Sequence, residues 1–518
     1  MGQGDLYIGG GGPDQRAPQL LLAQRANRHG LVAGATGTGK TVTLQILAES
    51  FSAAGVPVFA ADVKGDLSGI AKPGTNAHKL HDALQSRAGK IGFDAYGYAG
   101  FPTVFWDIFG EQGHPVRSTV SEMGPLLLAR LMDLTEAQEG VLNICFRLAD
   151  EEGLLLLDLA DLRAMLVHVG AHARELRLRF GNVSSASVGA IQRRLLVLEN
   201  QGGAGFFGEP ALRLADLMRC ASDGRGHVNI LAADRLMESP RLYATVLMWL
   251  LSELFEELPE VGDPDRPRLA VFFDEAHLLF DRAPRALVEK VEQVARLIRS
   301  KGVGVFFVTQ SPDDVPEDVL AQLGNRIQHA LRAYTPRERH AVRAAADSFR
   351  PNPRFATEEA ITALGIGEAL TSFLDRKGVP GMVERTLIRP PSSRIGPITA
   401  AERADLIAGS ELAGIYDTAL DRVSAYETLS ARTDQAQDWP GEGSPGQERA
   451  PSVPETRQYR SARVYTGAMS RDAGPRPQRS SRTDSLGTTF AKTVIRTAGS
   501  QLTRGLVRGV LGGLFRGR

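Results

Sequence analysis

The chain has 518 residues, of which 43% are apolar and 23% charged, a composition typical of a folded protein of two to four domains and not of a fibrous or wholly disordered chain. It shows no apolar run near the roughly 20 residues of a membrane-spanning helix and no secretory leader, so we expect a cytoplasmic location. The formal net charge is zero, but residues 430–518 hold 15 basic and 7 acidic side chains. The remaining body is therefore acidic, which excludes a uniformly nucleic-acid-binding surface; phosphate contacts would need a local patch, a pore loop or the tail.

Short, buried-type strands alternate with helices over residues 1–430. The pattern predicts helices at Thr41–Ala54, Pro240–Glu257 and Ala286–Lys301. Near-continuous apolar runs predict parallel strands covered on both faces, at Gly30–Gly34, Val56–Asp62, Thr103–Trp106, Val228–Ala232, Leu269–Phe273 and Val303–Thr309, with further strands at Arg326–Arg332 and Leu370–Leu374. This alternation predicts a doubly wound α/β sheet.

Three segments depart from that pattern. Residues 117–218 carry mostly helical signals and are predicted to form a helical insertion. Residues 431–488 are rich in Pro, Gly, Ser, Arg and Gln and too poor in apolar residues to order themselves, so we expect a disordered linker. Residues 489–518 interleave apolar residues with six basic ones and no acid, which predicts a basic amphipathic helix despite several glycines.

A glycine-rich segment follows the first of these strands and precedes the first helix. It fits the pattern G-x-x-x-x-G-K-[ST] of a phosphate-binding loop in the required strand–loop–helix context. Backbone N–H groups and the helix N-terminus would hold the phosphates, Lys40 would place a positive charge on the transferred phosphoryl group, and the Thr41 hydroxyl would bind Mg²⁺. The predicted ligands are ATP and Mg²⁺, and the binding residues are Gly34, Ala35, Thr36, Gly37, Thr38, Gly39, Lys40 and Thr41.

Two acids end the apolar strand Leu269–Phe273. Because a charged group at a buried strand end is costly without a partner or a task, we expect Asp274 to hold the Mg²⁺ through water and Glu275 to activate the attacking water. A structural ion pair or a helix cap is the alternative. The letters Asp-Glu-Ala-His are also found in superfamily-two helicases, but Asp274 follows Lys40 by 234 positions and no second motor domain fits in the chain.

The strand Val303–Thr309 also ends in polar residues. Its end should lie between the phosphate loop strand and the acidic strand, which makes Gln310 the first candidate for contact with the γ-phosphate or the water, and Thr309 the second. Arg296, Arg299 and Lys301 precede this strand. Arg299 is the preferred candidate for a finger that reaches a neighbouring subunit's nucleotide, against the alternative of ordinary surface cations.

Taken together, these motifs resemble the HerA–FtsK superfamily of P-loop motor ATPases, and within it the bacterial HerA-like, YjgR-type family. The resemblance covers most of residues 5–400 and includes the segments 27–30, 55–69, 309–312, 322–333 and 367–370. It implies a RecA-like fold, ATP hydrolysis, a hexameric ring, a sensor at Gln310 and a finger at Arg299. HerA itself carries a β-barrel before its phosphate loop, whereas the loop starts at Gly34 here.

Two functions follow from this resemblance and from the tail. The first is an oligomeric ATPase motor that moves double-stranded DNA. The second is an ATPase that acts on a protein partner or at the membrane surface through the basic helix at 489–518. A nucleotide-binding scaffold without turnover is disfavoured, because Lys40, Asp274, Glu275 and Gln310 are all present.

Overall fold

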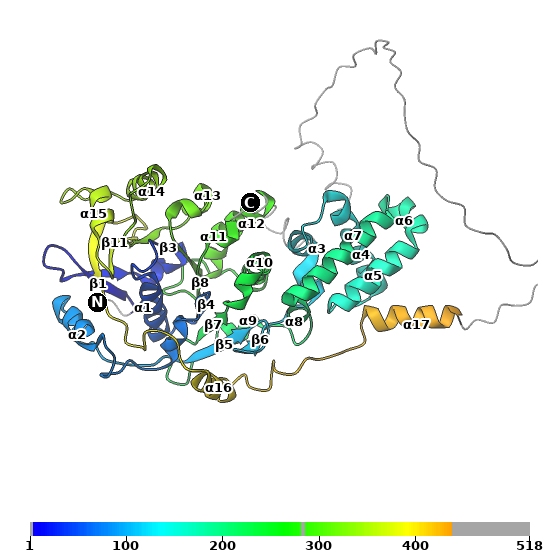
Figure 1. The fold of residues 1–518 in the computed structure, drawn as a ribbon, viewed down its shortest axis with the longest axis horizontal. Helices are drawn as coiled ribbons and strands as arrows, with labels where there is room; N and C mark the ends of the chain where they lie inside the picture. The colour runs from blue at the N-terminus through cyan, green and yellow to red at the C-terminus, as the bar shows by residue number, and fades with distance from the viewer. Residues whose placement is uncertain (1–3, 281–284, 438–518) are drawn as a thin grey trace, which may run out of the picture. The chain divides into compact units, whose positions relative to one another are not determined.

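The structure is a computed structural model that describes residues 4–280 and 285–437. Within these ranges one twelve-stranded sheet runs through the fold in the order β2-β1-β12-β11-β10-β3-β9-β8-β4-β7-β5-β6 (Figure 1). Its strands are β1 (Leu6–Gly11), β2 (Ala17–Leu21), β3 (Gly30–Ala33), β4 (Val58–Asp62), β5 (Thr103–Asp107), β6 (His114–Pro115), β7 (Val228–Ala232), β8 (Leu269–Phe273), β9 (Val303–Thr309), β10 (Asn325–Gln328), β11 (Glu368–Ser372) and β12 (Glu384–Ile388).

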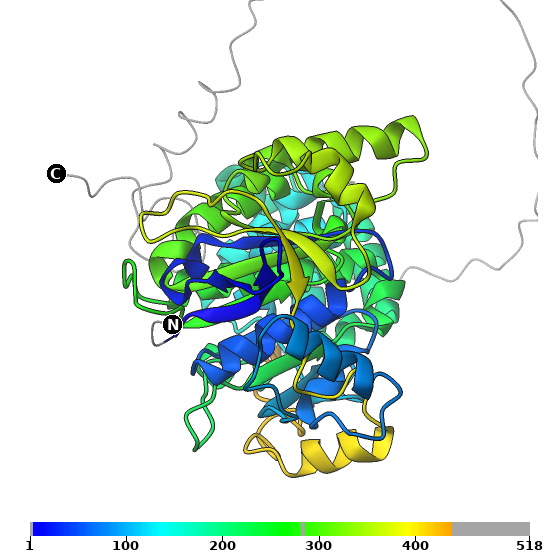
Figure 2. The same ribbon diagram turned by 90° about the vertical axis from the view of Figure 1, so that its left-hand side faces the viewer.

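The sheet changes direction at β10. All pairs from β10 to β6 are parallel, whereas those from β2 to β10 are antiparallel. All eight predicted strands are present, and β7, β8 and β9 have the predicted bounds. The sequence analysis missed the amino-terminal hairpin and the strands β6 and β12. Figure 2 shows that hairpin beside β12, where β1 pairs with it.

Helices cover both faces of the parallel part. On one face α1 (Lys40–Ala53) packs on Val32, Val58 and Phe272. On the other, α10 (Pro240–Glu257) and α12 (Arg285–Ile298) share a core with Leu31 and Phe273. Neighbouring residues of one strand thus enter different cores, as the alternation of side chains along a strand requires, and the predicted doubly wound α/β fold is confirmed.

Residues 120–217, between β6 and β7, are helical. The helices are α3 (Val120–Leu131), α4 (Glu136–Glu152), α5 (Leu159–Ala171), α6 (Ala173–Phe180), α7 (Ser185–Leu198), α8 (Ala204–Phe206) and α9 (Leu214–Leu217). Capping boxes at Thr119, Thr135 and Asp158 satisfy the first N–H groups of α3, α4 and α5. Their apolar faces join the same core as α10, so they pack directly on the sheet's helical layer.

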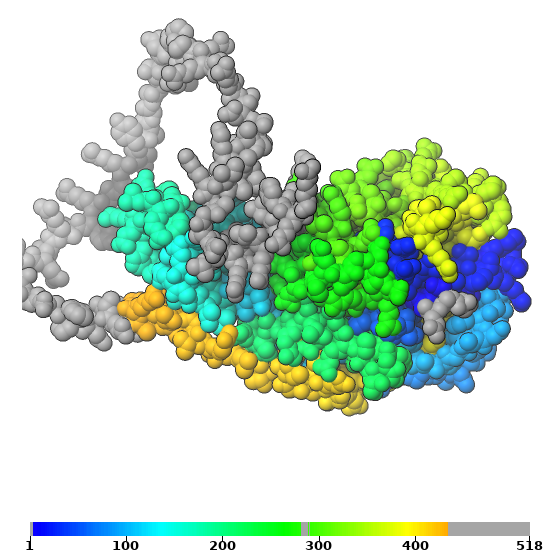
Figure 3. Space-filling model, turned by 180° about the vertical axis from the view of Figure 1, so that it is seen from behind, coloured from blue at the N-terminus to red at the C-terminus, as the bar shows by residue number. Residues whose placement is uncertain are grey.

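The remaining α-helices are α2 (His81–Lys90), α11 (His277–Phe280), α13 (Glu317–Leu320), α14 (Pro336–Asp347), α15 (Thr357–Ala363), α16 (Ala400–Ala408) and α17 (Ala425–Gln437). All but α17 flank the sheet; α17 begins at Ala425, whose N–H donates to the Leu155 carbonyl of the helical region. The segment after α16 lies along the helical region, because the Leu420 and Ala425 N–H groups donate to Glu209 and Leu155 carbonyls; Figure 3 shows this segment along the surface.

Two sequence expectations are wrong in this part of the chain. The disordered linker was expected to begin at residue 431, but residues 431–437 continue α17. The rest of that linker and the amphipathic helix at 489–518 lie outside the described residues. Arg326–Arg332 was expected as one strand, but β10 ends at Gln328. Across the described helices, none is long and apolar enough to cross a membrane.

Candidate functional site

The carboxyl ends of β3, β9, β8 and β4 meet at one edge of the sheet. β9 lies between β3 and β8, with Thr309 opposite Ala33 and Phe307 opposite Phe273. This is the position predicted for the strand that ends at Gln310. Because parallel strands end together, the phosphate loop, the acidic pair and Gln310 are brought to the same edge although up to 276 positions separate them in sequence.

The phosphate loop has the backbone conformation that its glycines were expected to allow. Gly34, Gly37 and Gly39 have φ values of 153°, 81° and 112°, in the region that side chains disfavour. A Cβ at Gly34 would lie 2.5 Å from the Cβ of His329, so the loop's start also needs glycine for space. The loop is fixed at its start by the Ala35 N–H, which donates to the Ala330 carbonyl at 2.8 Å.

The other amides of the loop are free to bind a ligand. In the described ranges, none of the backbone N–H groups of residues 36–41 reaches a protein acceptor. Donors clustered at the N-terminus of α1 form an anion site, so the loop fits a polyphosphate. Lys40 Nζ donates to the Gly34 and Ala35 carbonyls at 2.5 and 3.2 Å. Burial and the nearby Lys64 lower the pKa of Lys40.

The acidic pair is buried at the end of β8. Asp274 and Glu275 are 9% and 6% exposed, and Glu275 has a φ of 48°, a strained value that turns its side chain away from the strand direction. Burial raises the pKa of Asp274 to about 6, with the Glu275 charge adding to the rise. The Tyr243 hydroxyl donates to the Asp274 carbonyl at 2.7 Å and fixes the backbone here.

The Glu275 carboxylate is the meeting point of several side chains. Its Oε1 accepts from Lys64 Nζ at 2.8 Å, and its Oε2 lies 3.4 Å from both Gln310 Nε2 and His277 Nδ1. Burial acts to raise the pKa of Glu275, but Lys64 and Gln310 hold it below its ordinary value. Thr309 is not part of this group, because its hydroxyl donates to Asp314 at 2.7 Å.

Arg299 is far from this edge. It precedes β9, and its guanidinium contacts Asp263 at 3.3 Å together with Arg25 and Arg28. β9 spans seven residues, so about 20 Å separate Arg299 from the phosphate edge of its own chain. Of the two alternatives, Arg296 pairs with Glu292 and Lys301 lies over the Phe255 ring at 5.5 Å.

Two residues of the site had no role in the sequence analysis. Lys64 follows β4 and pairs with Glu275. His329 follows β10, is fully buried, and contacts the Thr43 hydroxyl at 2.9 Å and the Glu368 carbonyl at 2.9 Å; burial lowers its pKa to about 4. Lys64 lies just past the predicted strand Val56–Asp62, and His329 lies within the predicted strand Arg326–Arg332. Both belong to segments that resemble the HerA-like family, and this was the available signal.

The residues fit a magnesium ion that is bound mainly through phosphate and water. No group of three or more His, Cys, Asp or Glu side chains that could hold a metal occurs in the described part, so a cage made only of protein ligands is not present there. In nucleotide sites Mg²⁺ keeps several waters and takes one or two protein ligands besides phosphate oxygens. Thr41, in the first turn of α1 after the phosphate loop, and Asp274, at the end of β8, match that smaller requirement.

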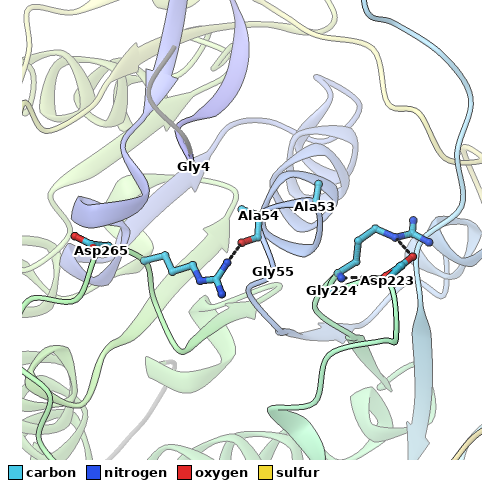
Figure 4. Close-up of a pocket in the computed structure, with 9 residues that line it drawn as sticks. Gly4, Ala53, Ala54, Gly55, Asp223, Gly224 and Asp265 are labelled. Carbon is cyan, nitrogen blue, oxygen red and sulfur yellow. Dashed lines mark hydrogen bonds and ion pairs between the residues drawn. The ribbon is translucent and has the colours of Figure 1, made fainter.

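A pocket of about 430 Å³ lies at the other end of α1 (Figure 4) and does not include the phosphate loop. Arg266 donates there to the Ala54 carbonyl, and Asp223 pairs with Arg225. A cation at the last carbonyls of a helix stabilises its C-terminus. We therefore assign this pocket a structural role in holding α1.

The fold and the site define a P-loop NTPase whose strand β9 stands between the phosphate loop strand and the acidic strand. The chain belongs to the helicase HerA-like C-terminal family, whose profile matches residues 11–518. This membership makes it a P-loop ATPase.

Solved structures with a similar chain path include a plasmid coupling protein and a VirB4 protein. Plasmid coupling protein TrwB, in complex with a non-hydrolysable GTP analogue, is 16% identical with a TM-score of 0.48, over 74% of this chain and 90% of that one. VirB4 of Thermoanaerobacter pseudethanolicus is 14% identical with a TM-score of 0.48, over 77% and 98%. A comparison with curated proteins finds no match.

Proposed function

We propose that the protein is an oligomeric, ATP-driven motor that moves double-stranded DNA. The observation that carries this proposal is the division of the ATPase machinery within one chain. Lys40, Asp274, Glu275 and Gln310 lie at one edge of the sheet, whereas Arg299 lies at the opposite edge. A chain that carries the phosphate-binding residues on one side and a candidate finger on the other is suited to a ring. In such a ring each subunit contributes its arginine to the ATPase site of the next subunit.

Within one chain, the proposed roles follow from the contacts. The loop amides and Lys40 bind the β- and γ-phosphates, and Thr41 and Asp274 hold Mg²⁺, which neutralises developing charge when bound. Glu275 accepts the proton of the attacking water. Gln310, whose amide is 3.4 Å from the Glu275 carboxylate, orients the same water from the neighbouring strand.

Arg299 is proposed as the finger for the next subunit. It cannot reach its own phosphate loop across the length of β9, and a guanidinium delivered from another subunit stabilises transition-state charge. The assembly proposed is a hexameric ring of the kind implied by the resemblance to the HerA–FtsK superfamily. The YjgR-type branch of that superfamily and a cytoplasmic location are part of the same proposal.

The experiment is a DNA-stimulated ATPase assay on the full chain. Linear duplex DNA should raise the ATPase rate several-fold at low salt, and added salt should weaken the effect, because phosphate contacts release counterions. Glu275→Gln should bind ATP and lose turnover by a factor of about 10² to 10⁴, while the exposed Glu136→Gln should behave as wild type. An ATPase indifferent to duplex DNA would contradict the DNA motor and leave the ATPase itself intact.

An alternative load is a protein partner or a membrane surface. The six basic residues and absent acids of 489–518 favour it, since such segments bind anionic lipids or partner helices. Removal of 489–518 should abolish binding to anionic vesicles or partners if this alternative holds, and should leave DNA stimulation unchanged.

A further inference from the structure

A strongly basic surface follows β10 in the otherwise acidic body. Residues 332–354 hold six arginines, no lysine and two acids, for a net charge of +4. All six are exposed in the structure. The four for which no ion pair is found define what we call the arginine surface: Arg332, Arg337, Arg339 and Arg350. Such a local patch is what an acidic protein needs in order to contact a phosphate backbone.

No ion pair joins a side chain of the arginine surface to a carboxylate among the residues that the structure describes, although the Thr335 N–H and, to a smaller extent, the charge of Arg332 act on Glu338 and lower its pKa. The two other arginines of the segment are neutralised, since Arg343 pairs with Glu358 and Arg354 with Glu384. Glu338, the nearest acid, accepts the N–H groups of Tyr334 and Thr335 at 2.9 and 2.8 Å. The positive charge of this surface is therefore available to an anion.

The fold holds these side chains outward. α14 begins with a capping box at Thr335, and its buried face, with Val342, Ala345 and Ala346, packs into a separate apolar cluster beside β11. The rest of the helix surface, including Arg337 and Arg339, is left exposed, and α14 lies at the periphery of the fold in Figure 1. Tyr334, immediately before the cap, is 83% exposed.

The composition of the surface favours nucleic acid over a membrane. Arginine forms paired hydrogen bonds with phosphate oxygens and stacks on flat groups, which lysine does not do, and an exposed tyrosine adds a face that can contact sugar or base. A membrane-binding helix would instead carry large apolar residues beside its cations, and the outer face of α14 has none. We propose that the arginine surface binds the phosphate backbone of double-stranded DNA.

The same segment is connected directly to the ATPase site. The Ala330 carbonyl accepts the phosphate-loop N–H of Ala35, and the preceding His329 contacts Thr43 in α1. Arg332 follows Ala330 by only two positions. A shift of the phosphate loop on hydrolysis would thus be transmitted through 329–331 to the bound DNA; this step depends on the proposed motor function.

The test compares two triple variants of the full chain with equal change in charge. One replaces Arg332, Arg337 and Arg339 with Gln. The control replaces Arg174, Arg177 and Arg193 with Gln; these are exposed arginines of the helical region for which the described structure also shows no ion pair. Binding of a fluorescent DNA duplex by anisotropy over a series of salt concentrations, binding to phosphatidylserine vesicles, and ATPase with and without DNA are measured for each.

The first variant should bind duplex DNA about tenfold more weakly or worse, with a salt dependence reduced by about three phosphate contacts, and should keep its basal ATPase within about twofold. The control should bind DNA as the wild type does. Equal weakening in both variants, or normal DNA binding by the first, would overturn the proposal, as would arginine-dependent binding to vesicles without binding to DNA. If the wild type hydrolyses ATP but neither binds DNA nor is stimulated by it, both the DNA-binding role of this surface and the DNA motor are refuted. If DNA stimulates the ATPase of the wild type and of the first variant equally, only the role of the surface is refuted.

Discussion

Lys64 and Glu275 form an ion pair across the carboxyl ends of two neighbouring strands, with Nζ 2.8 Å from Oε1. The two partners differ in environment, since the Lys64 side chain is 40% exposed and that of Glu275 only 8%. The backbone of Lys64 is held in place as well, because Asp62 accepts the Leu67 N–H at 3.0 Å and closes the loop around it. A buried carboxylate with one direct cation depends on that cation for its position.

Replacement of Lys64 should therefore impair the step that Glu275 performs. We expect Lys64→Met to lower kcat by about 10- to 100-fold, as expected when a general base is misplaced, and Lys64→Arg to recover part of the loss because it retains the charge. Steady-state kinetics at saturating ATP measure this effect.

The Glu275→Gln variant makes it possible to tell whether Lys64 positions Glu275 or binds the phosphates of ATP itself. If Lys64 acts through Glu275, adding Lys64→Met to Glu275→Gln should leave the affinity for a fluorescent ATP analogue unchanged within about twofold, since effects through one group are not additive. A large loss of affinity in that double variant would show instead that Lys64 binds the phosphates directly.

Arg299 offers a test of the shared site by mixing inactive subunits. Arg299→Ala should lower kcat by about 10³-fold or more if it is a finger, and Lys40→Ala should also be inactive. Mixed rings would contain interfaces that combine an intact phosphate loop with an intact Arg299. We expect the mixture to hydrolyse ATP about tenfold faster than either variant alone.

Arg296→Ala is the matched control, because that residue lies one turn earlier and pairs with Glu292 in its own helix. It should retain turnover. Mixtures that stay as inactive as their components, under conditions where subunits exchange, would rule out the arrangement in trans.

The parallel half of the sheet was predictable because its chemistry is local. β8 and β9 are nearly continuous apolar runs, buried on both sides, and each ends at polar residues, so the sequence marks both the strand and its end. The phosphate loop needs only neighbouring residues and the helix that follows. These features are enough to predict that Lys40, Asp274 and Gln310 lie at one edge of the sheet.

The parts that escaped prediction depend on distant partners. β1 holds three consecutive glycines and β2 a proline, residues that a strand tolerates near a sheet edge. β1 is held in the sheet by its pairing with β12, which is far from it in sequence. From the sequence alone, Lys64 has the character of a surface lysine. Its contact with Glu275 forms only because β4 and β8 pair in the sheet.

His29 should make stability depend on pH. It is buried between α12 and β9, with Nε2 2.6 Å from the Ala295 carbonyl and Nδ1 accepting the Val305 N–H at 3.0 Å. Protonation would place two donors face to face, and burial lowers its pKa to about 4 from 6.5. As the pH falls, the unfolded chain therefore binds this proton before the folded chain does. The contribution of neutral His29 to the free energy of unfolding is complete above about pH 6.5. It declines as the pH falls toward 4, by at most roughly 1.4 kcal/mol per pH unit.

The measurement is the difference in melting temperature between the wild type and His29→Gln, from pH 7.5 down to 5. Other groups that titrate in this range affect both proteins equally, so their effects on the melting temperature cancel in the difference. Asp62 is one of them, because burial raises its pKa to about 7. It should narrow as the pH falls. A constant difference over this range would mean that His29 does not titrate differently in the folded and unfolded chains.

The buried pair of Arg389 and Glu49 should be the costliest ion pair to break. Its atoms lie 2.9 Å apart with side chains 7% and 1% exposed. Glu49 also accepts N–H groups of Ser392 and Ser393, so it ties the chain after β12 to the helix of the phosphate loop. Glu49→Ala should destabilise the protein by about 3 to 5 kcal/mol, because it leaves a buried guanidinium without its countercharge.

The matched control is Arg385→Ala, which breaks the more exposed pair with Glu368 and should cost about 1 kcal/mol or less. Thermal or denaturant unfolding of the full chain measures both. If Glu49→Ala together with Arg389→Met proves more stable than Glu49→Ala alone, the loss arises from the unpaired charge and not from the missing contacts of Glu49. Equal losses in the single and double variants would instead assign the stabilisation to the serine N–H groups that Glu49 accepts.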